Sequence, residues 1–277
     1  MRSVCLLLLY TTVAFAASVI PDRKCRGVYF DNKYYDIEIL KEGINKIHQL
    51  VFNNNDNTVY FTFGQIGAVP YRSLGYYNLD TRQAGLIGGV RNASGVAVDQ
   101  IKNKVYVGGI DGVYALNRDK EPERYPIYDN IHKLFFRDVL YYINVRKEAY
   151  VFDNGIVNRM PELQTEKVDD IIVDDDDNVF FLQNDTLFRV KLGTRAINIH
   201  EGYPINVMAV DPYYRAFFST KNGIFIYNKY KFALDRVSRM KDLRALAFTK
   251  NMEPIYAVVD ILIKLKANPT NCYDYRI

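Results

Sequence analysis

The chain has 277 residues, of which 49% are hydrophobic and 25% are charged. This balance is typical of a folded globular protein and argues against a disordered chain or one that lies mostly in a membrane. The formal net charge of +4 is small, and lysines and arginines are dispersed along the sequence. Nucleic acid is therefore not an expected partner, because its phosphates are normally met by a basic stripe or patch.

Residues 1–16 have the pattern of a secretory signal peptide. Arg2 supplies the positive charge, residues 4–9 form the apolar run, and Ala14-Phe15-Ala16 matches the small-x-small cleavage pattern. The apolar run is shorter than the about 20 residues that cross a bilayer. We therefore expect a secreted protein with no membrane anchor, whose residues 17–277 form a single domain.

Removal of the leader leaves two cysteines, Cys25 and Cys272, near opposite ends of the mature chain. An even number of cysteines in a secreted protein predicts a disulfide. By loop-closure entropy such a bridge contributes about 5 kcal/mol at most. The alternative is two unpaired thiols, which requires the two ends of the chain to lie apart.

A repeat of short strands runs from about residue 30 to residue 265. In each unit an apolar strand is followed by a polar turn, and the second strand of the hairpin begins with an apolar residue followed by an aromatic one. The aromatic residue recurs at intervals of 35 to 46 residues, at Tyr60, Tyr106, Tyr141, Phe180, Phe217 and Tyr256. Repeats of about forty residues built from short strands predict an all-β fold, a six-bladed β-propeller.

The sixth unit ends after its third strand, at about Leu265. Residues 27–30 and 34–40 form a strand pair that belongs to no earlier unit. We expect these N-terminal strands to complete the sixth blade, since closure removes exposed sheet edges. Closure also brings Cys25 close to Cys272, which supports the disulfide.

The residue before each inner strand should stand at the mouth of the central channel, where propellers usually bind ligands. When the six repeats are aligned, the residues at this position are all polar, and we interpret the neighbouring positions as apolar. The six polar residues are His48, Ser94, His132, Asp169, Asn206 and Arg244. We interpret this ring, together with Gln49 beside His48, as a ligand-binding site. The alternative is that strand beginnings are polar only because they are exposed.

Metal binding stays an open alternative at this ring. His48, His132 and Asp169 are possible ligands of a transition metal, and Asp169 with Asn206 of calcium, but no fixed short spacing supports either. The run from Asp174 to Asp177 lacks the spacing of a calcium-binding loop and is interpreted as a solvated hairpin. No metal and no cofactor are therefore expected to be required.

Other motifs narrow the possible functions. No Gly-x-Ser-x-Gly motif and no Gly-x-Gly-x-x-Gly motif occurs, so hydrolase or oxidoreductase chemistry has no positive support. Asn92 and Asn184 are N-glycosylation acceptors in Asn-x-Ser/Thr sequences. The 23 tyrosines and 16 phenylalanines are expected mainly to pack between blades, although some could stack on a planar ligand.

The sequence resembles the ommochrome-binding proteins secreted by moths and butterflies. The resemblance includes the leader, the opening Cys25-Arg26-Gly27-Val28, the phrases 48–52 and 57–61, and Cys272 near the end. It implies a non-enzymatic haemolymph carrier of ommochromes, which are flat, carboxylated phenoxazinone pigments. We expect the protein to be a monomer. Arg244 suits a carboxylate of such a ligand.

Two functions from other classes stay open. A calcium-dependent lactonase or esterase needs several carboxylate or amide ligands converging in the channel, whereas the ring offers only Asp169 and Asn206. A protein-binding propeller needs a broad apolar face, which the sequence does not show. We expect the carrier function.

Overall fold

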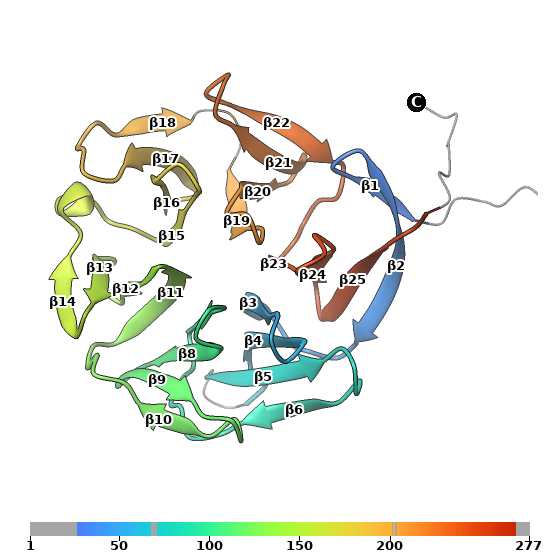
Figure 1. Ribbon diagram of the computed structural model, residues 1–277, viewed down its shortest axis with the longest axis horizontal. Coiled ribbons are helices and arrows are strands. Elements are labelled where there is room, and N and C mark those ends of the chain that lie inside the picture. Colours follow the sequence, from blue (N-terminus) through green and yellow to red (C-terminus); the bar gives the residue numbers. More distant parts are fainter. Residues whose placement is uncertain (1–26, 68–70, 201, 203, 270–277) are drawn as a thin grey trace, which may run out of the picture.

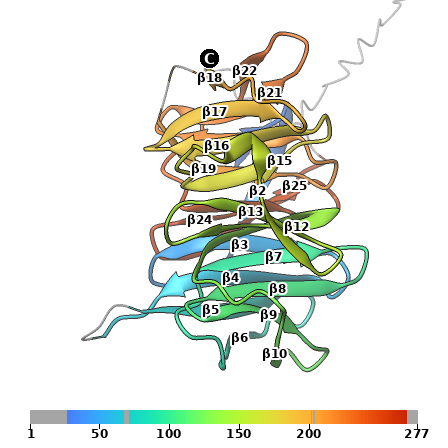
Figure 2. The same ribbon diagram turned by 90° about the vertical axis from the view of Figure 1, so that its left-hand side faces the viewer.

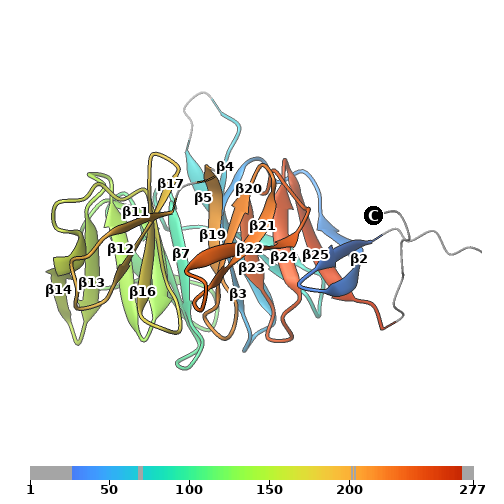
Figure 3. The same cartoon turned by 90° about the horizontal axis from the view of Figure 1, so that it is seen from above.

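The computed structural model describes residues 27–67, 71–200, 202 and 204–269. In this part of the chain six antiparallel sheets stand in a ring around a central axis (Figure 1). The ring is flat, as the two perpendicular views show (Figures 2 and 3). The predicted six-bladed β-propeller is confirmed. The predicted signal peptide, Cys25 and Cys272 lie outside the described residues, so the disulfide stays a prediction.

Blades 1 to 5 are each a meander of four consecutive strands. Blade 1 contains β3 (Ile47–Asn53), β4 (Thr58–Gly64), β5 (Arg72–Asn78) and β6 (Ala84–Ile87). Blade 2 contains β7 (Gly95–Asp99), β8 (Lys104–Gly109), β9 (Gly112–Leu116) and β10 (Pro122–Arg124). Blade 3 contains β11 (Ile131–Arg137), β12 (Val139–Asn144), β13 (Ala149–Asp153) and β14 (Ile156–Arg159).

Blade 4 contains β15 (Asp170–Val173), β16 (Asn178–Gln183), β17 (Thr186–Lys191) and β18 (Asn198–His200). Blade 5 contains β19 (Ile205–Val210), β20 (Ala216–Thr220), β21 (Gly223–Asn228) and β22 (Ala233–Ser238). Among the described residues the one helix is a 3-10 turn, η1 (Pro161–Leu163), and no helix there is long and apolar enough to cross a membrane.

Blade 6 is built from both ends of the described chain. Its inner strands are β23 (Ala245–Phe248), β24 (Pro254–Val258) and β25 (Ile261–Ala267). The outer strands come from the N-terminal side, β2 (Lys33–Lys41) and β1 (Val28–Phe30), and β2 pairs antiparallel with β25. The expected closure by N-terminal strands is therefore confirmed, with one strand more than the repeat requires (Figure 1).

The hairpin after each inner strand follows one design. Each contains a residue with a φ between 50° and 65°, which Asn and Asp adopt more readily than other non-glycine residues. In five of the six hairpins of the described chain, a buried side chain at the end of the inner strand accepts hydrogen bonds from N–H groups of the turn. These side chains are Asn53, Asp99, Asp174, Asp211 and Thr249.

The hydrophobic core lies between neighbouring blades. Six clusters of buried residues occur in the described chain, one at each contact between blades. Tyr60, for example, lies opposite Val51 in blade 1 and packs in the cluster shared with blade 2. Burial of these aromatic rings supplies much of the hydrophobic stabilisation, because each removes a large apolar area from water.

Blade 6 departs from the aromatic repeat by one residue. Ile255, and not Tyr256, lies opposite Ala247, at the position that Tyr60 occupies in blade 1. Ile255 faces blade 1, whereas Tyr256 packs in the cluster shared with blade 5. The sequence alignment that equated Tyr256 with the other aromatics is therefore wrong by one position, and a shift of one residue turns a side chain to the other face of a strand.

Candidate ligand-binding channel

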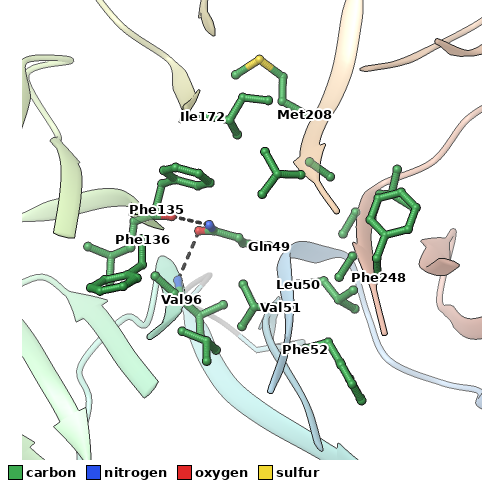
Figure 4. A pocket seen from close by; sticks show the side chains of 18 of the residues that line it. Gln49, Leu50, Val51, Phe52, Val96, Phe135, Phe136, Ile172, Met208 and Phe248 are labelled. Atoms are coloured by element: carbon green, nitrogen blue, oxygen red, sulfur yellow. Dashed lines mark hydrogen bonds between the residues drawn. The ribbon is translucent and has the colours of Figure 1, made fainter. Parts of the chain in front are cut away.

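A channel of about 390 Å³ follows the axis of the propeller, lined by residues of the inner strand of every blade. This volume lies within the range of small-molecule pockets. The middle of its wall is apolar, and Figure 4 shows the side chains of Val51, Phe135, Ile172, Met208 and Phe248 around the opening. Val51 and Phe135 are only half-buried, so they retain surface that a ligand could cover.

One end of the channel, called here the polar mouth, carries most of the polar side chains that line the channel. Its residues are His48, Gln49, Lys133, Asp170, Asn206 and Arg244. His48 and Asn206 each stand at a β-bulge, where the pairing with the second strand shifts by one residue. A bulge leaves its extra residue unpaired and re-aims its side chain. The predicted site residues His48, Gln49, Asn206 and Arg244 are therefore brought together.

The side chain of Gln49, in blade 1, links blades 1, 2 and 3 through hydrogen bonds at this mouth. Its amide nitrogen donates to the carbonyl oxygen of Leu134 in blade 3, at 2.6 Å, and its amide oxygen accepts from the N–H of Val96 in blade 2, at 3.2 Å (Figure 4). Both groups of the side chain are thus used by the protein itself. Gln49 also lines the channel, and the prediction that it contacts a ligand stays a prediction.

The remaining predicted residues do not line the channel. Ser94 is buried and donates a hydrogen bond to the carbonyl oxygen of Ile131. Asp169 forms an ion pair with Lys147, 2.6 Å between Oδ1 and Nζ, and accepts from the N–H of Asn184 at 2.8 Å. Burial alone would raise the pKa of Asp169, but these two partners hold it below its usual range.

His132 stands at a third bulge, between Ile131 and Lys133, and is half-buried beside the channel wall. Its pKa is lowered chiefly by burial and further by Lys133 and Arg72, against which Asp170 and Asp169 act in the opposite direction. A neutral imidazole at this position is a hydrogen-bonding group and carries no charge.

The charges of the polar mouth are unevenly balanced. Lys133 and Asp170 form an ion pair with 3.1 Å between Nζ and Oδ2, and both are largely buried. Arg72, Lys46 and Arg244 have no ion-pair partner among the described residues. The pKa of His48 is lowered to about 4, first by burial and then by these cations and Lys133. The mouth is therefore basic, although His48 is neutral at pH 7.

The other end of the channel, the hairpin mouth, has a different character. It is lined by Asn54, Gln100, Ile101, Asp138 and Tyr214 from the turns that follow the inner strands. Ile101 is exposed, and Arg137 behind Asp138 lies over the ring of Tyr214 and pairs with Asp177. Among the described residues that line the channel, the cations Lys133 and Arg244 both belong to the polar mouth, which gives the channel a direction for a charged ligand.

The described residues include no group of three or more His, Cys, Asp and Glu side chains placed to hold a metal ion. The run from Asp174 to Asp177 does form the predicted hairpin. Asp174 is buried and holds the turn, rather than being solvated as expected. The other three carboxylates pair with Arg137 and Lys229 of the neighbouring blades.

Asn92 and Asn184, the predicted glycosylation acceptors, are both exposed, with φ near 50°. The side-chain oxygen of Asn92 accepts from the N–H of Arg72 at 3.0 Å. A glycan on Asn92 would therefore be attached close to the start of β5, beside the polar mouth. Occupancy of either acceptor stays a prediction.

Sequence reasoning missed Lys133, Asp170, Phe135 and Arg72. Lys133 and Asp170 each directly follow a residue of the predicted ring. We interpreted this position of the repeat as apolar, but it is not apolar in every blade. The signal was present in the sequence, since Gln49, Lys133 and Asp170 are aligned with one another. Arg72 does not line the channel, but its charge lowers the pKa of His48. It had no such signal in the sequence, because it lies at the start of the third strand of blade 1.

No protein-family model matches the chain. Over 246 residues it is 26% identical to the ommochrome-binding protein of Manduca sexta, an alignment that covers 86% of this chain and 90% of that protein. Solved structures of low identity share the fold. One is a gluconolactonase from Xanthomonas campestris, with a TM-score of 0.66 and 11% identity over 88% of this chain and 96% of that one.

A putative gluconolactonase gives a TM-score of 0.66 at 10% identity, over 84% of this chain and 92% of that one. The WD40 propeller domain of Doa1 gives 0.59 at 14% identity, over 89% and 98%. At such identities the likeness concerns the fold alone. The chain is therefore a six-bladed β-propeller that resembles the ommochrome-binding proteins along most of its length.

Proposed function

We propose that this protein is a carrier that binds a small planar aromatic pigment of the ommochrome type in its central channel. The observation that carries the proposal is the channel itself, with half-buried apolar side chains along its middle, hydrogen-bonding groups at both mouths and the cations Lys133 and Arg244 at the polar mouth. An apolar wall with a few polar groups is the common composition of small-molecule sites. The similarity to the ommochrome-binding protein of Manduca sexta supports the choice of ligand.

The proposal includes the setting in which the carrier works. Residues 1–16 would direct it out of the cell and into the haemolymph, where it would act as a monomer without enzymatic activity or a required cofactor. The contrast between the two mouths supports binding in one orientation, with the ring system against Phe135 and a carboxylate toward Arg244.

A spectroscopic measurement tests the carrier function. Protein purified from its native source should carry a visible chromophore, and recombinant protein should take up an ommochrome with quenching of tyrosine fluorescence, the dominant emission of a chain without tryptophan. Arg244→Ala should weaken the binding about tenfold, the usual cost of removing a charged hydrogen-bond partner. Arg82→Ala, on an exposed turn of blade 1, is the matched control. A colourless protein that takes up no pigment would refute the carrier.

The second candidate is a calcium-dependent lactonase, and the shared fold with gluconolactonases keeps it under test. In the polar mouth Asp170 already faces Lys133, and Arg244 adds a further positive charge. A divalent cation there would meet repulsion from both cations. Stoichiometric calcium in the purified protein together with hydrolysis of gluconolactone would favour the enzyme and overturn the carrier.

A further inference from the structure

Gly64 lies at the edge of the polar mouth, close to His48 and opposite Arg72 at the start of β5. Gly64 lies opposite Arg72 in the pairing of β4 with β5, and its N–H donates to the carbonyl oxygen of Lys46 at 3.1 Å. A Cβ atom on Gly64 would lie 3.8 Å from Nε2 of His48. The imidazole of His48 and the side-chain amide of Asn45, at 3.6 Å, therefore border a position that has no side chain of its own, and Arg72 lies directly across the strand pair from it.

The main chain holds Arg72 in place while leaving its guanidinium without an acidic partner. Its N–H donates to Asn92, and Arg72 begins β5, which is paired along its length with β4. The side chain is half-buried, and burial lowers its pKa. Within the described part of the chain no carboxylate compensates this charge. A partly desolvated, unpaired guanidinium is a strong donor for an anion.

We propose that Arg72, together with His48 and Arg244, forms a subsite for the carboxylate of a planar aromatic ligand. The inference rests on the proposed function and deepens it, because it assigns the anionic end of the ligand to this mouth and names Arg72 as the residue that selects for it. The ring system of the ligand would then extend past Gln49 to the apolar wall at Val51 and Phe135.

The surroundings favour an aromatic carboxylate over a free inorganic anion. Phosphate or sulfate would accept hydrogen bonds from the same guanidinium groups. Such an anion would leave the half-buried apolar wall of the channel exposed to water. A ligand with an apolar body gains from both parts of the channel, since burial of apolar surface adds to the charged hydrogen bonds.

The three histidines of the chain provide a direct readout, because each gives its own imidazole signal in a proton NMR spectrum. The signal of His48 is identified by its loss in His48→Gln. We expect quinoline-2-carboxylate to shift this signal in a saturable way, and the neutral quinoline-2-carboxamide to bind at least about tenfold more weakly. Inorganic phosphate should bind more weakly than the aromatic carboxylate.

Arg72→Gln is the decisive variant, and Arg82→Gln, an exposed arginine of the same blade, is its matched control. Arg72→Gln should weaken quinoline-2-carboxylate binding about tenfold with little effect on the carboxamide, while the control binds like the wild type. Thermal unfolding verifies that both variants are folded. A variant of Arg72 that does not fold is replaced by Arg72→Lys, which keeps the charge but not the planar fork and should also bind more weakly.

The possible results distinguish a failure of the proposed subsite from a failure of the proposed pigment-carrier function. Equal binding of carboxylate and carboxamide, no binding of either, or an unchanged affinity in Arg72→Gln would overturn the subsite. Selective binding of the carboxylate by a protein that takes up no ommochrome would support the subsite and refute only the proposed pigment.

Discussion

His48 shows how a single side chain takes its properties from its surroundings. An exposed histidine has a pKa of about 6.5, whereas burial and four nearby cations lower that of His48 to about 4. The cations are Arg72, Lys46, Lys133 and Arg244. Protonation would add a fifth positive charge to a mouth where Asp170 is the one carboxylate among the described residues that line it, so the folded protein disfavours it.

This shift predicts a pH dependence of stability. The unfolded chain binds a proton at His48 below about pH 6.5, while the folded chain does so only near pH 4. The unfolding free energy therefore falls as the pH drops from 6.5 toward 4. His48→Gln should lose less stability over this interval than the wild type, measured by urea denaturation at pH 7 and pH 4.5. Equal losses in the two proteins would show that His48 titrates normally in the folded state.

At the scale of the element, the inner hairpin is the repeated structural device. Its turn is held by one buried oxygen-bearing side chain at the end of the inner strand, such as Asp174, whose Oδ1 accepts from the N–H groups of Asp176 and Asn178 at 2.9 and 2.8 Å. Burial raises the pKa of Asp174, although its hydrogen bonds act against this. The next residue, Asp175, is exposed and takes no part in the turn's own hydrogen bonds.

Substitution of these neighbours should therefore differ sharply. Asp174→Ala leaves buried N–H groups of the turn without an acceptor and should lower the unfolding free energy by about 1–3 kcal/mol. Asp175→Ala, the control, removes one exposed ion pair with Lys229 and should cost well under about 1 kcal/mol. Urea denaturation of both variants measures the difference. Similar small losses would mean that the turn forms without Asp174.

The repeat of these hairpins was readable from the sequence because turn chemistry is local. Asn and Asp clusters after each apolar strand predicted the turns at 53–57 and 174–177, and both are present. The register of blade 6 was not readable in the same way. Which of Ile255 and Tyr256 faces blade 1 depends on pairing with Ala247, and both residues are apolar enough for either face.

At the scale of the whole molecule, the ring is closed by the strands from the N-terminal side. Phe30 of β1 is 2% exposed and stacks on Phe217 of blade 5, with 5.8 Å between ring centroids. It also contacts Phe248 of blade 6 at 5.9 Å. The hydroxyl of Ser238 donates to the carbonyl oxygen of Tyr29 at 2.8 Å, so β1 joins blade 6 to blade 5.

Phe30→Ala tests whether this junction holds the propeller together. Removal of a buried ring should lower the unfolding free energy by about 3–5 kcal/mol. Tyr29→Ala, at a residue that is 45% exposed, is the neighbouring control and should cost less. Thermal and urea unfolding measure both variants. A loss below about 1 kcal/mol in Phe30→Ala would indicate that blades 5 and 6 remain joined without β1.

The sequence by itself determined the architecture, since the repeat, the turns and the unclaimed N-terminal strand pair are properties of local pattern and spacing. It also located four residues of the polar mouth, because inner strands of a propeller begin at the same end of the channel. The tertiary structure alone decided which polar residues the protein uses internally, as with Gln49, Ser94 and Asp169, and which stay unpaired. It also placed Arg72 near His48, where its charge lowers the pKa of the imidazole, and this proximity is set by strand pairing within blade 1 and not by any short motif.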